Sequence, residues 1–207
     1  MIKRLLLVVL VLVLGIAGYY WYMFSRKGKD NNDGQKQAPI ALKKHSEAFN
    51  KSITAAMNAY FDMKNGFVEA DTIAVATATK KFIQLLDSIP LTELKKDTLT
   101  IYETALANLN DIKLNAASLL KQPNITEMRH DFSTVSELLY PSFFKTINYE
   151  GDKMYWENCP MAFGEDKGAN WISNTDEIIN PYLGKQHPEY HATMLHCGEV
   201  KDTIKAQ

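Results

Sequence analysis

An uninterrupted apolar run near the start of the chain constrains its fold and location more than any other feature. The run extends from Leu5 to Phe24, directly after the basic residues Lys3 and Arg4. As a helix, a run of this length covers a hydrocarbon core of roughly 30 Å. Aromatic residues crowd positions 19–22, as is typical of the boundary between lipid and water. We therefore expect residues 1–24 to form a signal anchor, with residues 5–24 crossing the inner membrane.

A cleaved signal peptide is the alternative interpretation of the same segment. Gly15 and Ala17 are small residues placed as at a cleavage site, and the apolar core of residues 5–14 is short enough for a signal peptide. Under either interpretation an apolar N-terminal segment directs export of the downstream residues. The soluble part is then expected in the periplasm, anchored or free. Residues 25–44 are hydrophilic and rich in Lys, Asn, Gln and Gly, which predicts a flexible tether.

Residues 45–148 have the pattern of four amphipathic helices. Apolar side chains recur every three to four residues, and the stripes are separated at Gly66, Pro90 and Pro123. Each helix must bury its stripe against the others, and the connections are short, so we expect an antiparallel four-helix bundle. The helix boundaries are set by local signals. We expect Gly66 to end the first helix, Asp71 to cap the second, Asp97 or Thr98 to begin the third, Thr126 to cap the fourth, and Pro141 to kink or end it.

The composition changes at Tyr149, and helical periodicity is lost there. Residues 149–207 contain both cysteines, five of the ten glycines and three of the five histidines. The pattern of residues 153–158 and 169–173 predicts short strands. We expect a loop-rich cap that packs on the bundle. The predicted fold is thus mostly α: one N-terminal membrane helix, a four-helix bundle, and a cap with short strands.

Several function classes find no support in the sequence. The formal net charge is −1, with 23 basic and 24 acidic residues, so we expect no nucleic-acid partner. There is no phosphate-binding loop, no catalytic triad and no paired-carboxylate motif. We therefore do not expect an enzyme.

Two short segments of the cap combine sulfur donors. Cys159 lies two residues before Met161, and Met194 lies three residues before Cys197. Thiolate and thioether sulfurs are soft ligands that suit Cu(I) or Ag(I). His196 adds an imidazole, and an indole face can stabilise a cation. The predicted metal site comprises Cys159, Met161, Met194, Cys197 and His196, with Trp156 and Trp171 in support.

A disulfide between Cys159 and Cys197 is the main alternative. Paired cysteines in an exported domain usually form a disulfide, which would close a large loop and hold the cap together. Met161 and Met194 would then fill the core. Free buried thiols and a zinc site with histidines also remain open, although the cysteines do not form a C-x-x-C pair.

Several spaced motifs resemble a known family. They are the block from Tyr60 to Val68 followed by Asp71, the segments 159–162, 168–173 and 180–184, and Met194 to Gly198. Over residues 49–200 the chain resembles an uncharacterised bacterial exported domain that also occurs fused to periplasmic adaptor subunits of heavy-metal efflux pumps. The resemblance implies no enzymatic activity. It implies metal handling in the envelope and an efflux adaptor as a partner. This chain has no adaptor region, so it would act alone or in trans.

Overall fold

The computed structural model describes Tyr19 and residues 44–205. The chain divides into two units, residues 1–38 and 39–207, and the elements below all belong to the second. Apart from Tyr19, the predicted membrane helix of residues 5–24 lies outside the described residues, and so do residues 25–43 of the tether. Within the described part, no helix is long and apolar enough to cross a membrane.

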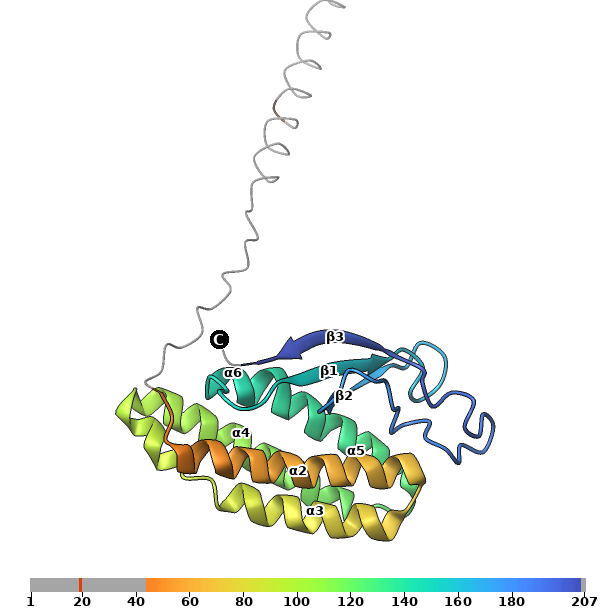
Figure 1. The fold of residues 1–207 in the computed structure, drawn as a ribbon, viewed down its shortest axis with the longest axis horizontal. Helices are drawn as coiled ribbons and strands as arrows, with labels where there is room; N and C mark the ends of the chain where they lie inside the picture. The colour runs from red at the N-terminus through yellow and green to blue at the C-terminus, as the bar shows by residue number, and fades with distance from the viewer. Residues whose placement is uncertain (1–18, 20–43, 206–207) are drawn as a thin grey trace, which may run out of the picture. The chain divides into compact units, whose positions relative to one another are not determined.

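Four helices run side by side in alternating directions, as the sequence predicts (Figure 1). Their apolar stripes face one another and form a continuous core that includes Phe49, Phe82, Leu109 and Phe132, each at most 4% exposed. The helices are α2 (Glu47–Glu69), α3 (Thr72–Asp87), α4 (Leu99–Leu119) and α5 (Ile125–Glu137).

Side-chain caps begin the four helices. Asp71 accepts hydrogen bonds from the backbone N–H groups of Ile73 and Ala74, and Thr98 accepts one from Ile101, so these two predicted boundaries are confirmed. The predicted cap at Thr126 is wrong. Asn124 caps α5 instead, because its side-chain oxygen accepts from the Glu127 N–H, one turn further on.

The predicted end of the first helix at Gly66 is also wrong. α2 continues to Glu69 and ends at Ala70, whose φ of 57° provides the left-handed cap. Gly66 instead allows α3 to approach closely. A Cβ added at Gly66 would lie 2.9 Å from Cγ2 and 3.0 Å from the backbone nitrogen of Val75. This glycine therefore serves helix packing and not helix termination.

Pro141 interrupts the last helical segment, as predicted. After α5 the chain widens into a π-type turn, η2 (Leu138–Phe143), in which Tyr140 leaves helical geometry. The helix resumes only for α6 (Phe144–Thr146). A 3-10 turn, η1 (Leu91–Lys96), joins α3 to α4 and was not predicted.

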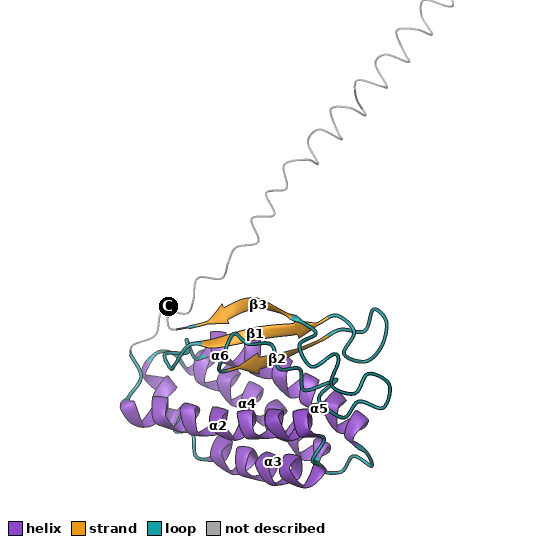
Figure 2. Cartoon of the chain, turned by 45° about the vertical axis from the view of Figure 1, so that its right-hand side comes forward, coloured by secondary structure: helices purple, strands orange, loops and turns teal. Residues whose placement is uncertain are grey.

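A small antiparallel sheet forms the C-terminal part, on one side of the bundle (Figure 2). The strands are β1 (Met154–Cys159), β2 (Ala169–Ser173) and β3 (Glu199–Ile204), in the order β2-β1-β3. Two strands were predicted within one residue of these bounds, whereas β3 was missed. β1 is central and pairs with both neighbours.

The sheet and the loops around it dock on the bundle through buried polar and aromatic contacts. The hydroxyl of Tyr60 in α2 accepts a hydrogen bond from the backbone N–H of Ile172 in β2 at 3.1 Å. Arg129 in α5 donates to the carbonyl oxygens of Phe67 and Pro181, at 2.9 Å each. Tyr182 is 1% exposed and packs against Phe132. The C-terminal part therefore shares one core with the helices.

Candidate functional site

The two cysteines lie together in the folded chain. Their sulfur atoms are 3.4 Å apart, although 38 residues separate them in sequence. Cys159 is fully buried at the end of β1, and Cys197 is half-buried just before β3. Both are free thiols. The fold thus brings these two candidate residues together, at a separation compatible with small movements toward a disulfide or a shared ion.

The antiparallel pairing of β1 with β3 explains why the thiols meet. Asn158 is opposite Glu199 in this ladder. Cys159 comes one residue after Asn158, and Cys197 precedes Glu199 by two, so both leave the same end of the ladder. Directly after Cys197, Gly198 has a φ of +144°, and a Cβ there would lie 2.7 Å from the Asn158 carbonyl oxygen. A side chain at this position would push Cys197 away from β1.

The protonation state of Cys197 does not favour nucleophilic attack. Burial raises the pKa of Cys197 to about 11, and the hydrogen bond and electrostatic interaction with Cys159 act in the same direction. The thiolate is the reactive and metal-binding form. Near neutral pH Cys197 is therefore protonated, and a bound soft ion or an oxidant would displace its proton.

Of the two supporting tryptophans, Trp171 lies next to the thiol pair and Trp156 does not. Trp171 is opposite Glu157 and Ala169 is opposite Cys159, so Trp171 shares a sheet face with Cys159. A Cβ on Gly198, the neighbour of Cys197, would lie 3.1 Å from Cη2 of Trp171. Trp156 points to the other face and packs on Tyr140, with 5.4 Å between ring centroids.

The two methionines are half-buried and pack against the core. Met194 opens the turn that contains Cys197, because its carbonyl oxygen accepts from the Cys197 N–H at 3.0 Å. Met161 lies in the turn directly after β1, and its carbonyl oxygen accepts from Gly164. Both thioethers are thus close in sequence to the thiols, on segments that the fold holds in place.

His196 is exposed, and its Nδ1 lies 2.8 Å from the carbonyl oxygen of Ile178. A carbonyl oxygen only accepts, so Nδ1 carries the proton and Nε2 keeps its lone pair in the neutral ring. Among residues 44–205 and Tyr19, however, no three His, Cys, Asp or Glu side chains gather in a metal-binding group. The thiol pair therefore has no third donor of these types in the described residues.

Sequence reasoning missed two buried polar residues, one in β1 and one in α2. Glu157 in β1 is fully buried, and Lys64 in α2 is 4% exposed and donates to the hydroxyl of Ser173. Burial raises the pKa of Glu157 to about 7, while the charge of Lys64 and the indole N–H of Trp171 oppose part of this rise. Asn180 was expected only to mark a turn, yet it is fully buried and contacts Cys197. No local sequence pattern distinguishes these buried polar residues from polar residues on the surface.

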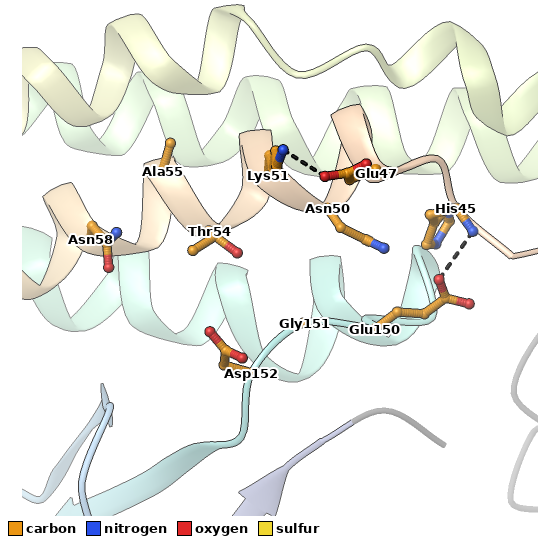
Figure 3. A pocket seen from close by; sticks show the side chains of 10 residues that line it. All are labelled: His45, Glu47, Asn50, Lys51, Thr54, Ala55, Asn58, Glu150, Gly151 and Asp152. Carbon is orange, nitrogen blue, oxygen red and sulfur yellow. Dashed lines mark hydrogen bonds and ion pairs between the residues drawn. The ribbon is translucent and has the colours of Figure 1, made fainter.

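A separate pocket lies along the N-terminal half of α2 (Figure 3). It is bordered by Asn50, Thr54, Asn58 and the segment Glu150 to Asp152, and it includes none of the predicted site residues. Several of its charged groups are already paired: Lys51 pairs with Glu47 at 2.6 Å, and the Glu150 carboxylate accepts from the backbone N–H of His45 at 3.0 Å. The thiol pair remains the better candidate.

Comparison with known proteins gives one match, and it covers most of the helical part of the chain. Residues 56–149 match a family model described as a protein of unknown function, DUF3347. The DUF3347 match begins within α2 and stops just before β1, so it includes neither cysteine. It supports the helical half of the resemblance noted in the sequence, and it carries no statement about export or efflux. No curated protein and no solved structure matches the chain.

Proposed function

We propose that this chain is an exported, membrane-tethered accessory protein that binds one soft monovalent ion, Cu(I) or Ag(I), between the reduced thiols of Cys159 and Cys197. The observation that carries the proposal is the 3.4 Å separation of the two sulfur atoms. Two thiolates are sufficient for an ion that accepts two soft ligands. The proposed role is binding and transfer, not catalysis.

The donor types near the pair favour a soft ion over zinc. A structural zinc site needs four ligands, usually Cys and His, whereas no group of three such side chains gathers in the described residues. Sulfur is the most abundant further donor on the same segments, in Met161 and Met194. We assign these thioethers and Nε2 of His196 as auxiliary ligands, and Trp171 as the aromatic wall beside the ion.

The proposed location rests on the sequence. Residues 5–24 would anchor the chain in the inner membrane, with residues 45–207 in the periplasm; cleavage after Ala17 would release the same domain. The resemblance to domains fused to efflux adaptors makes a heavy-metal efflux adaptor the proposed partner. Holding an ion at this place would keep it available to such a pump.

The first test is protection of the thiols by Ag(I). We expect one equivalent of Ag(I) to block both thiols of the reduced chain from a thiol reagent. The Cys197→Ser variant should lose this stoichiometric binding. Met161→Leu with Met194→Leu conserves side-chain volume and should cost under about 1.5 kcal/mol of stability. A weaker Ag(I) affinity in that double variant supports the thioether ligands, and an unchanged affinity removes them from the site.

The second candidate function is a structural or protein-interaction module held together by a Cys159–Cys197 disulfide. It is favoured by the lack of a third His, Cys, Asp or Glu donor among the described residues and by the proximity of the thiols. A thiol count on the exported chain, purified without reductant, separates the candidates. Two free thiols that Ag(I) protects favour the ion site. No free thiols, and no ion binding after reduction, favour the disulfide module.

A further inference from the structure

The side chain of Asn180 joins its own turn, residues 180–184, to the turn that carries Cys197, and it is fully buried. Its amide nitrogen donates to the carbonyl oxygen of Cys197 at 2.8 Å. Its amide oxygen accepts from the backbone N–H groups of Tyr182 and Leu183, at 2.8 and 3.1 Å. Asparagine is suited to this position because one planar group both donates and accepts.

The backbone of Asn180 reinforces the same connection. Its N–H donates to the carbonyl oxygen of Leu195 at 2.8 Å, and its carbonyl oxygen accepts from Gly184 at 3.0 Å. The turn that carries Cys197 is therefore attached to Asn180 at two points, Leu195 and Cys197. The segment around Asn180 is itself attached to the bundle, since Arg129 donates to Pro181.

The position of Cys197 depends on these hydrogen bonds because Cys197 does not belong to a helix or a strand. Residues 174–198 form turns and one isolated bridge, with no helix or strand. Cys159, by contrast, is held at the end of the central strand of the sheet. The proximity of the two thiols thus depends mainly on what restrains the Cys197 backbone.

We propose that Asn180 is the positioning residue of the thiol pair: its hydrogen bond to the Cys197 carbonyl confines that thiol opposite Cys159 and raises their effective concentration toward each other. This inference rests on the proposed function in treating the pair as the site, but it concerns the thiols themselves. Confinement favours every product that joins the two sulfur atoms, whether a disulfide or a shared soft ion.

The test uses Asn180→Asp in the full chain, held in mild detergent because of its apolar N-terminal run. Aspartate keeps the side-chain shape and the acceptor oxygen of asparagine. It lacks the N–H donor, however, and places a carboxylate oxygen against the Cys197 carbonyl oxygen. The matched control is Asn158→Asp. The Asn158 amide also donates to a backbone carbonyl, that of Ala169, and its side-chain hydrogen bonds go to β2 and not to Cys197. Folding of each variant is checked by far-ultraviolet circular dichroism.

The readout is the thiol–disulfide equilibrium with glutathione. Glutathione disulfide oxidises the two thiols to one disulfide and is itself reduced to two glutathione thiols. The two protons released by the cysteines are taken up by the two glutathione sulfur atoms. A net hydrogen bond of about 1.4 kcal/mol corresponds to a factor of ten. We expect Asn180→Asp to lower the equilibrium constant about tenfold and Asn158→Asp to change it by less than about threefold.

Equal effects of the two variants, or no effect of Asn180→Asp, would overturn the positioning role. If Asn180→Asp does not fold, Asn180→Ser replaces it; serine adds no charge and is too short to reach both partners, so the same decrease is expected. Ag(I) titration separates this inference from the proposed function. If Ag(I) binds none of the variants but the glutathione constants differ as expected, the ion site fails and the positioning role stands.

Discussion

The environment of Glu157 shifts its acid–base chemistry away from that of an ordinary glutamate. It is a carboxyl group with no exposed surface, on the face of β1 that also carries Cys159. Burial raises its pKa from 4.5 to about 7. A group whose pKa is higher in the folded chain binds its proton more tightly there. Its contribution to stability is fully present below about pH 4.5 and is lost as the pH rises through about 7.

We therefore expect the free energy of unfolding to decrease between about pH 5 and pH 8, and Glu157→Gln to remove most of that decrease. The glutamine keeps the shape of the side chain and cannot ionise. The expected loss in the unchanged chain is about 2–3 kcal/mol. Guanidinium denaturation at a series of pH values, with reductant present, measures it.

Glu177→Gln is the control for this prediction, since Glu177 is an exposed carboxylate on the loop after β2. It should leave the pH dependence as it is. If Glu157→Gln shows the same slope as the unchanged chain, Glu157 is not the group that titrates in this range.

At the level of elements, the close contact of α2 with α3 depends on Gly66. Glycine within a helix lowers stability relative to alanine by about 1 kcal/mol, so helix propensity alone would favour replacing it. The position is nevertheless buried against Val75, and backbone as well as side-chain atoms of Val75 border it. Backbone atoms cannot turn aside as a flexible side chain can.

We expect Gly66→Ala to destabilise the domain by about 1–3 kcal/mol, because the added methyl group forces α3 away from α2. Thermal or chemical unfolding measures this change. Asn58→Ala tests helix propensity alone, since Asn58 is exposed in the same helix; it should be neutral or slightly stabilising. An increase in stability for both Gly66→Ala and Asn58→Ala would contradict this prediction, because it would show that α3 can move away from α2 without a loss of folding free energy.

At the level of the whole molecule, the thiol pair connects the end of β1 to the last strand of the domain. Closing a loop of 38 residues restricts the unfolded chain. We expect the oxidised domain to be more stable than the reduced domain by about 2–4 kcal/mol. Denaturation with and without reductant measures the difference. Cys197→Ser should abolish it, and a difference that persists in that variant would have another source.

The sequence by itself determined the parts of this protein that depend on local interactions. A helix forms its hydrogen bonds within one turn, so the spacing of apolar residues, the caps at Asp71 and Thr98, and the break at Pro141 could all be inferred from neighbouring residues. The strand at Ala169–Ser173 was also predicted, because its composition is apolar and aromatic. The change of composition at Tyr149 marked the start of the non-helical part.

Only the tertiary structure decided what depends on distant partners. β3 is polar and mostly exposed, so it has no alternating pattern, and its conformation results from pairing with β1. That pairing also brings Cys197 to Cys159. The burial of Glu157 and the contact of Asn180 with Cys197 likewise require segments far apart in sequence. Hydrogen bonds between strands and loops join residues that are far apart in sequence, and no local sequence pattern identifies such partners. The two cysteines could therefore be selected from the sequence as candidate site residues, but their proximity could not be derived from it.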